Sequence, residues 1–224
     1  MRIGFLGDLH GEFYVLDKIT KTAKDGGVEL IIQVGDFGFY PRQMAMLMET
    51  EIHVPIYCID GNHENFEFLY KLIEGFDGDV VPIKDEKVWY VKRGSVVDID
   101  GKKFGFLGGA ASVDKAWRTP LVDWFPGEQI TDEEIARFDN VDKLDYLIVH
   151  TPPHCIVRDY FDPNSLLMFG LPITWTDPSA HKVEALWERL NRPMLYCGHM
   201  HRKVLSDDHK CRVLDIEELV YEDI

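Results

Sequence analysis

The chain has 224 residues, and 46% of them are hydrophobic, which is enough to bury a sizeable core in a single domain spanning residues 1–224. Its formal net charge is −15. This balance argues against stable binding to duplex nucleic acid or to an anionic membrane, because contacts with phosphate groups need clustered Lys and Arg. A local acidic cluster would still attract divalent cations, so a metal-bridged phosphate ligand stays compatible with the charge.

The cysteines and the N-terminus indicate a soluble cytoplasmic protein. Cys58, Cys155, Cys197 and Cys211 form no C-x-x-C pair, and three of them lie in or beside apolar runs, as buried free thiols do in a reducing compartment. The N-terminus leads directly into a predicted strand, without the basic and apolar regions of a signal peptide. No apolar run approaches the roughly 20 residues of a membrane span.

The first third of the chain alternates between short apolar runs and amphipathic segments. Residues 12–24 place apolar side chains at helical spacing, and Pro41 stands where the next helix would begin. The predicted elements are a strand over 2–6, a helix over 12–24, a strand over 30–34, a helix over 41–50, a strand over 54–59 and a helix over 64–73. This alternation predicts largely parallel strands covered by helices.

The middle of the chain has a different pattern. Short apolar runs over 88–91, 95–99 and 103–107 are separated by turn signals, so we predict an antiparallel meander. Residues 110–130 are irregular and rich in aromatic side chains. Thr131, with Glu134 three residues later, has the form of a capping box at the start of a helix.

The last third returns to the first pattern. The predicted elements are a strand over 146–149, a long loop over 155–179, a helix over 180–191, a strand over 194–197 and a closing hairpin over 203–206 and 211–215. The loop contains the apolar run Leu166 to Phe169. Three interpretations stay open for this run: a contact in a homo-oligomer, a lid, or a loop packed on the core.

Side chains that bind metals follow the apolar runs, most of them beside a glycine. They are Asp8, His10, Asp36, Asn62, His63, His150, His199 and His201. In open α/β sheets, ligand sites form outside the carboxyl ends of strands, and loops after different strands can converge there. A neighbouring glycine lets the backbone turn sharply and approach closely. We therefore expect one site built from several distant segments.

The ligand types favour a pair of metal ions. Carboxylate, amide oxygen and imidazole together suit Mn²⁺ best, with Fe²⁺/Fe³⁺ and Zn²⁺ as alternatives, whereas Mg²⁺ or Ca²⁺ sites would use fewer histidines. Seven ligands, counted without His63, are too many for one tetrahedral ion. Two ions about 3.5–4 Å apart that share a carboxylate would use all seven, and could hold a phosphoryl group.

Five motifs in this order resemble the calcineurin-like metallophosphoesterase superfamily, especially its small bacterial and phage members. They are Asp8-x-His10, Gly35-Asp36, Gly61-Asn62-His63-Glu64, His150 after a strand, and Gly198-His199-x-His201, so they cover nearly the whole chain. The resemblance implies an α/β fold, a four-layer α/β/β/α sandwich with two mixed β-sheets, around a dinuclear metal centre.

The resemblance also implies a role for each residue. Asp8, His10 and His201 would hold the first metal, Asn62, His150 and His199 the second, and Asp36 would bridge both. A metal-bound hydroxide would attack phosphorus in line. His63 would assist the leaving group as a general acid or as an electrostatic stabiliser.

Two arginines of the similar Ser/Thr phosphoprotein phosphatases are missing here. In those phosphatases an Asp-Arg-Gly comes after the bridging Asp, whereas here Asp36 is followed by Phe37-Gly38-Phe39-Tyr40. Asp60 stands where an Arg would precede Gly-Asn-His. If Asp60 faces the site, it would repel a dianionic phosphomonoester more than a phosphodiester. We therefore expect a phosphodiesterase, including activity on cyclic nucleotides. The alternatives are a broad phosphomonoesterase or a Ser/Thr phosphoprotein phosphatase and, from a different class, an inactive scaffold on the same fold.

The sequence offers fewer candidates for contacts with the substrate than for metal ligands. Arg42 and Arg118 could replace the missing arginines, and Trp117 or Trp124 could wall the leaving group. The competing interpretation makes the tryptophans part of the core and Arg118 a surface ion-pair partner. Pro152-Pro153 could direct His154 toward the site or away from it. His53, His181 and His209 are not expected to be ligands.

Overall fold

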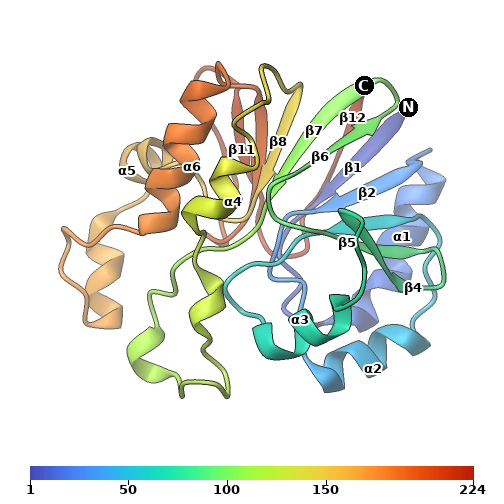
Figure 1. Cartoon of the computed structure of the whole chain (residues 1–224), viewed down its shortest axis with the longest axis horizontal. Coiled ribbons are helices and arrows are strands. Elements are labelled where there is room, and N and C mark those ends of the chain that lie inside the picture. Colours follow the sequence, from blue (N-terminus) through green and yellow to red (C-terminus); the bar gives the residue numbers. More distant parts are fainter.

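A computed structural model describes residues 1–224 and contains two six-stranded sheets, with strand orders β12-β1-β2-β3-β5-β4 and β10-β11-β9-β8-β7-β6 (Figure 1). In each sheet, four neighbouring strands are parallel and one antiparallel strand lies at each edge. Both sheets are therefore mixed, and the prediction of largely parallel strands is confirmed.

The elements have the following bounds. The first sheet consists of β1 (Arg2–Leu6), β2 (Leu30–Gln33), β3 (Ile56–Cys58), β4 (Val80–Lys84), β5 (Val88–Val91) and β12 (Leu219–Asp223). The second consists of β6 (Ser95–Ile99), β7 (Lys102–Leu107), β8 (Tyr146–Val149), β9 (Met194–Cys197), β10 (Val204–Leu205) and β11 (Cys211–Val213). The α-helices are α1 (Leu16–Asp25), α2 (Pro41–Glu49), α3 (Phe66–Ile73), α4 (Asp132–Ala136), α5 (His154–Tyr160) and α6 (Pro178–Arg189). Short 3₁₀ helices are η1 (Phe13–Val15), η2 (Lys115–Trp117), η3 (Pro126–Glu128) and η4 (Pro163–Phe169).

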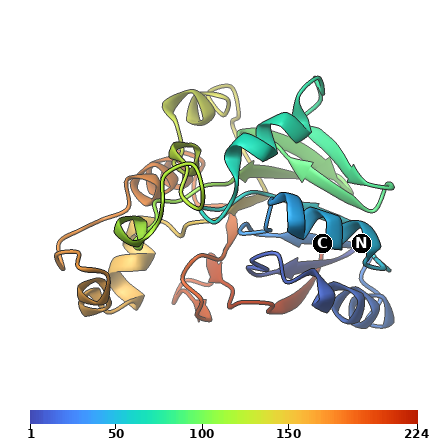
Figure 2. The same cartoon turned by 90° about the horizontal axis from the view of Figure 1, so that it is seen from below.

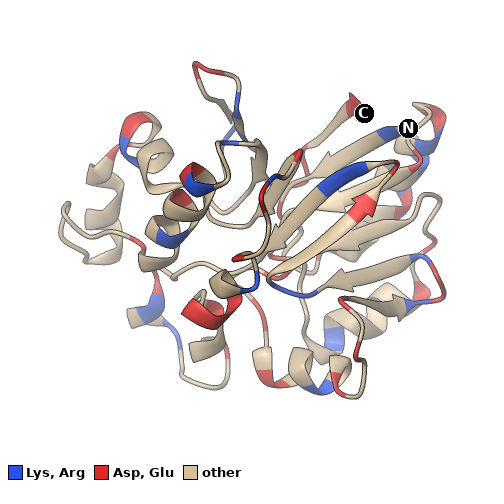
Figure 3. Ribbon diagram, turned by 45° about the horizontal axis from the view of Figure 1, so that its top comes forward, with Lys and Arg blue, Asp and Glu red and all other residues tan.

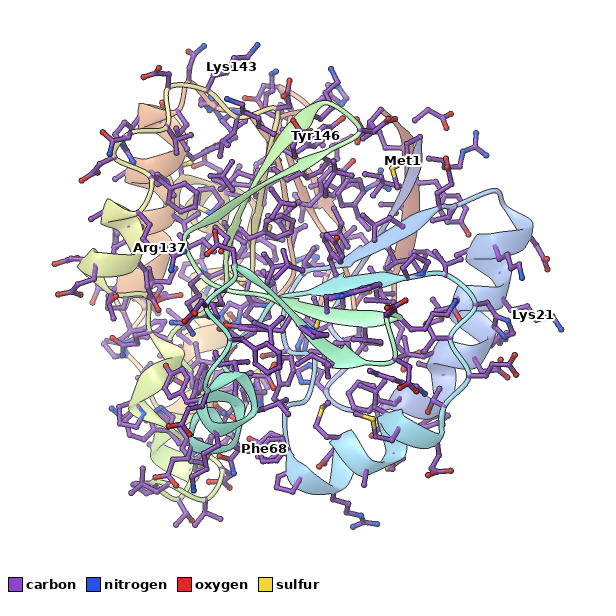
Figure 4. The ribbon with its side chains drawn as sticks, turned by 45° about the vertical axis from the view of Figure 1, so that its right-hand side comes forward. Met1, Lys21, Phe68, Arg137, Lys143 and Tyr146 are labelled. Atoms are coloured by element: carbon purple, nitrogen blue, oxygen red, sulfur yellow. The ribbon has the colours of Figure 1, made fainter.

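Three hydrophobic clusters hold the layers together. One lies between the sheets and includes Phe5 and Phe106, and Figure 4 shows side chains filling this space. The second packs α1, α2 and α3 on the outer face of the first sheet, through residues such as Leu16 and Leu69. The third packs α5 and α6 on the outer face of the second sheet around Trp187. Figure 2 shows α1 and α6 on opposite sides of the molecule. The predicted four-layer sandwich is confirmed.

The predicted antiparallel meander is wrong in part. Strand β5 pairs with β3 and β4 in the first sheet, whereas β6 and β7 form a hairpin in the second. The connection between β5 and β6 therefore crosses from one sheet to the other. Arg93 lies in this connection, and its buried guanidinium donates to the carbonyl groups of Gly127 and Gln129. Turn signals are local, so they do not reveal which sheet the next strand will join.

The predicted loop over 155–179 is also wrong in part, because it contains the end of α5, all of η4 and the start of α6. Helix α5 buries Ile156 in the cluster with α6. The prediction also missed β4 and β12. Strand β12 pairs antiparallel with β1, so the two chain ends lie side by side (Figure 1). The capping box of Thr131 and Glu134 is confirmed at α4.

The outer surface is charged on many elements. Figure 3 shows that Lys and Arg residues are spread over several helices, strands and loops. None of the helices combines the length and the apolar character that crossing a membrane requires.

Candidate metal centre

The predicted ligands lie in loops that follow strands of both sheets, at strand ends that point away from the chain termini (Figure 1). Asp8, Asp36 and Asn62 follow β1, β2 and β3 of the first sheet, and His150 and His199 follow β8 and β9 of the second. Because parallel strands end at the same edge, their loops converge. Both sheets thus contribute ligand-type side chains to a single place.

Asp8, His10 and His201 form a cluster that we call the open half-site. His10 Nε2 lies 2.9 Å from His201 Nε2, which in turn lies 3.2 Å from Asp8 Oδ2. The side chains of His10 and His201 are 24% and 43% exposed, whereas Asp8 is fully buried. Three donor atoms therefore point at one position that solvent can reach.

Asn62, His150 and His199 form the buried half-site. Asn62 Oδ1 lies 3.1 Å from His150 Nε2 and 2.9 Å from His199 Nδ1. His150 is inaccessible to solvent, and its Nδ1 donates to the carbonyl oxygen of Val34 at 3.0 Å. This hydrogen bond fixes the ring so that Nε2 faces the site, as in metal-binding histidines.

Asp36 lies between the two half-sites. Its Oδ2 is 3.6 Å from His10 Nδ1 and 3.4 Å from His150 Nε2, and it is buried with no hydrogen-bond partner. The other oxygen, Oδ1, accepts the backbone N–H of His63 at 2.7 Å. An unpaired buried carboxylate oxygen is costly. A cation would satisfy this oxygen, and the donor set fits two metal ions that share Asp36.

The electrostatics of the site agree with this fit. Burial works against the charge of Asp36, yet His150, His63 and His10 hold the pKa of its carboxyl well below the usual value. Burial also disfavours the cationic form of His150, but Asp36 raises the pKa of that ring to about 10. At His199, burial prevails and lowers the pKa. A cation between the half-sites would replace the proton of His150, because a metal ligand must be neutral imidazole.

Several of the predicted ligands have a strained backbone conformation. Four of the seven predicted ligands have positive φ angles, which few non-glycine residues adopt and which cluster at functional sites. They are His10 at 49°, Asp36 at 50°, His199 at 68° and His201 at 48°. A Cβ atom on Gly198 would lie 1.9 Å from Asp8 Oδ1, so only glycine lets β9 approach this carboxylate.

Three side chains that the sequence interpretation did not use hold the ligands in place. Asn62 Nδ2 donates to Ser112 Oγ at 3.0 Å, and Ser112 Oγ donates to Glu128 Oε2 at 2.5 Å, so Oδ1 of Asn62 faces the histidines. Glu64 is buried and accepts backbone N–H groups of residues 37–39, in the loop after Asp36. Only Glu64 had a sequence signal, its place in the Gly-Asn-His-Glu motif.

His63 lies at the rim of the site, with its ring centroid 5.0 Å from that of His10. Arg118 Nη2 lies 2.6 Å from His63 Nε2, 2.7 Å from His63 Nδ1 and 2.9 Å from Asp114 Oδ1. Burial lowers the pKa of His63, although Asp36 opposes this effect. The structure thus places Arg118 next to the predicted catalytic histidine, a partner that could not be identified from the sequence.

The other predicted contact residues lie apart from the half-sites. Arg42 is exposed on α2 and forms no ion pair within the protein. Trp117 is 65% exposed and packs on Phe169, with ring centroids 5.2 Å apart. Trp124 lies under Lys115, whose Nζ is 3.9 Å from the ring centroid. His154 stacks on His181 at 4.0 Å.

Asp60 does not face the site, so the predicted repulsion of a phosphomonoester does not apply. Its carboxylate is fully buried, and Oδ1 accepts from Arg93 Nη2 at 2.6 Å and Nε at 2.8 Å. Oδ2 accepts from the hydroxyl of Tyr90 at 2.6 Å. Arg93 therefore neutralises Asp60 within the core.

Comparisons with known proteins identify the family. The profile described as calcineurin-like phosphoesterase matches residues 1–203. A comparison with curated proteins finds no match. Among solved structures, TT1561 of Thermus thermophilus is similar at 16% identity, with a TM-score of 0.58 over 96% of this chain and 88% of the other. GAP50, the anchor in the inner membrane complex of Plasmodium, is similar at 11% identity, with a TM-score of 0.53 over 96% of this chain and 71% of the other. At these identities the likeness shows the fold alone.

Proposed function

This chain belongs to the calcineurin-like phosphoesterase family, and we propose that it is a two-metal phosphoesterase that prefers phosphodiesters to phosphomonoesters. The observation that carries the proposal is the buried, unpaired Oδ2 of Asp36 between two sets of converging donor atoms. Few arrangements other than a bridged pair of cations would satisfy that oxygen and both half-sites together.

Each half-site supplies the ligands of one ion. Asp8, His10 and His201 would hold the first ion and Asn62, His150 and His199 the second, with Asp36 shared by both. The mixed donor set favours Mn²⁺, with Fe and Zn²⁺ as alternatives. When bound, the ions supply Lewis-acid stabilisation of the phosphoryl charge and activate water for attack.

His63 and Arg118 would act on the organic side of the ester bond. Because burial lowers the pKa of His63, the ring is neutral near pH 7 and can donate one N–H to the departing oxygen. Arg118 keeps its guanidinium 2.6 Å from this ring, within reach of a phosphate bound beside it. An Arg118→Ala enzyme with unchanged kcat/KM would remove this role.

The partial neutralisation of the positive charge beside His63 supports the diester preference. Arg118 is already shared with Asp114 at 2.9 Å, so its charge is partly compensated. A phosphomonoester carries close to two negative charges at neutral pH, whereas a phosphodiester carries one. The single charge of a phosphodiester needs fewer cationic groups to bind it. This reason for a diester preference does not depend on Asp60.

A hydrolysis screen under Mn²⁺ tests the proposal. It compares a bis-aryl phosphodiester, an aryl phosphomonoester and cyclic nucleotides, with bound metal measured in the same samples. We expect kcat/KM for the diester to exceed that for the monoester by at least about tenfold, a difference of about 1.4 kcal/mol in barrier. A faster monoester would indicate a phosphomonoesterase. Bound metal without any turnover would indicate a scaffold.

A further inference from the structure

Arg93 lies in the connection between β5 and β6, where the chain crosses from the first sheet to the second, and its side chain is only 5% exposed. Its Nε and Nη2 donate to Oδ1 of Asp60 at 2.8 and 2.6 Å. Its Nη1 and Nη2 also donate to the carbonyl oxygens of Gln129, Gly127 and Glu128, at 3.0, 3.0 and 3.3 Å. The guanidinium therefore joins two segments that are far apart in the chain.

The first of these segments leads into Asn62 of the buried half-site. Asp60 stands two residues before Asn62, and its carboxylate accepts the hydroxyl of Tyr90 at 2.6 Å in addition to Arg93. The backbone carbonyl of Asp60 accepts the N–H of Gly109 at 3.2 Å. Because both its side chain and its backbone are held, the turn that carries Asn62 starts from a fixed position.

The second segment carries the group that orients the amide of Asn62. Ser112 Oγ accepts from Asn62 Nδ2 and donates to the carboxylate of Glu128, which also accepts the backbone N–H of Ser112 at 3.1 Å. Glu128 is only 1% exposed, and its carbonyl oxygen accepts from Arg93 and from the N–H of Ala110 at 2.9 Å. Arg93 thus reaches the Asn62 amide by a second path.

We propose that Arg93 is a positioning residue, which keeps Oδ1 of Asn62 turned toward the two histidines of the buried half-site before an ion binds. It closes a ring of hydrogen bonds and main chain whose other members are Asp60, Asn62, Ser112 and Glu128. The inference rests on the proposed two-metal function and adds the residue that organises one of its metal positions. Arginine suits this role because its planar guanidinium holds five donors in fixed directions, whereas lysine has one nitrogen on a flexible stem.

The open half-site has no part in this ring. The side chains of Asp8, His10 and His201 contact one another, and none of them forms a hydrogen bond to a member of the ring. A positioning role for Arg93 therefore predicts a loss of metal affinity at the buried half-site alone. A general structural role predicts a similar loss at both half-sites.

Arg93→Lys tests the inference without leaving the charge of Asp60 unpaired. Lysine keeps a positive charge opposite Asp60, but its single nitrogen cannot also hold the three carbonyl oxygens. Mn²⁺ titrations are made in two backgrounds: His201→Ala, which disables the open half-site, and His199→Ala, which disables the buried one. We expect Arg93→Lys to raise the Kd about tenfold in the first background, as loss of a ligand support does, and less than about twofold in the second.

A double-mutant cycle with Ser112→Ala, measured in the His201→Ala background, identifies the path. Without the Ser112 hydroxyl, the Asn62 amide no longer depends on the segment that Arg93 holds. Arg93→Lys should then raise the Kd by less than about threefold, because residues of one hydrogen-bond network do not act additively. Independent changes would instead multiply their effects on the Kd.

Two control variants separate positioning from a loss of stability. Arg2→Lys makes the same change at an arginine that also binds a carboxylate through two nitrogens, that of Asp223, and a backbone carbonyl, that of Gly26. Leu190→Ala removes a buried side chain at the end of α6, just before β9 and at the strand end away from the ligands. Neither variant should change the Kd in either background, even where Leu190→Ala lowers the Tm as much as Arg93→Lys does.

The outcomes distinguish this inference from the proposed function. If the unmodified protein binds no Mn²⁺, the two-metal function fails. If it binds Mn²⁺ and Arg93→Lys raises the Kd equally in both backgrounds, or in neither, the positioning role is overturned while the two-metal function stands. A rise of the Kd in Leu190→Ala equal to that in Arg93→Lys, or full multiplication of effects in the double-mutant cycle, also contradicts the positioning role.

Discussion

The open and buried half-sites use similar side chains but are supported very differently. In the buried half-site, Val34 fixes the ring of His150, and Ser112 fixes the amide of Asn62. In the open half-site, the rings of His10 and His201 contact each other and are partly in solvent. If the two half-sites bind metal as proposed, the buried position is organised before the ion arrives, and the open position would be completed by the ion.

This difference predicts unequal metal binding. A ligand whose orientation is already fixed loses little entropy when an ion arrives, whereas an exposed ring must be ordered at that moment. We therefore expect the ion of the buried half-site to bind more tightly and exchange more slowly. Removing Asp36, the carboxylate common to both half-sites, should abolish the difference in metal affinity between them. Weakening the hydrogen bonds that support the buried half-site should narrow this difference.

Asp36→Asn gives the largest expected effect, because it acts on both half-sites. The variant loses the shared negative charge, so both ions should be lost. Turnover should fall by more than about 10³-fold, beyond the cost of removing one electrostatic donor. Metal analysis after gel filtration and diester hydrolysis measure the two effects. Normal metal content with normal turnover would contradict the bridging role.

His63→Ala should leave both half-sites loaded. The ring is outside the ligand set, so the variant should lose rate by about 10²–10⁴-fold, as when an acid or base is removed. Metal content and kcat are measured on the same preparation. His209→Asn, a change at an exposed histidine outside the predicted ligand set, serves as the control. Metal loss in His63→Ala would show that His63 is a ligand.

Ser112→Ala should narrow the difference between the half-sites. Without the hydroxyl, Asn62 Nδ2 loses its acceptor and the amide can turn away from the histidines. We expect metal affinity at the buried half-site to fall by about 10–100-fold, with the open half-site little affected. Titration with Mn²⁺ measures this change. Equal weakening of both ions would instead point to a general loss of structure.

Limited chelation sharpens the comparison directly, because it removes ions without changing any ligand. A limiting chelator should remove the ion of the open half-site first, so metal loss should occur in two phases. An ion whose free concentration is 100 times its Kd stabilises the fold by about 2.7 kcal/mol. The Tm of thermal unfolding should therefore fall in two steps as chelator is added. Loss of both ions in a single phase would show that the half-sites are energetically equivalent.

Much of the site could be predicted because its residues follow local rules. Each ligand comes just after an apolar run and most lie beside a glycine, and the structure brings all seven together. The supports could not be predicted in the same way. Ser112 and Glu128 lie in irregular segments, and a hydrogen bond between them depends on how those segments fold over Asn62.

The errors in the fold have the same origin. The element positions followed from periodicity, but the sheet that each strand joins depends on contacts distant in sequence. Residues 88–107 look like one meander, yet the chain changes sheets at Arg93, whose partner Asp60 lies after β3. Asp60 was misjudged for the same reason, because its sequence position beside Asn62 did not show that its side chain turns into the core.

The contact between His10 and His201 joins residues 191 positions apart in the chain. Such separation means that the open half-site cannot exist in a partly synthesised or partly folded chain, because β9 must first join its sheet and the two sheets must then dock. Contacts of this kind form late and slow folding, since the loop they close is long. Ion binding at the proposed open half-site would therefore mark completed folding. A higher metal concentration would stabilise the native state against incomplete conformers without speeding folding.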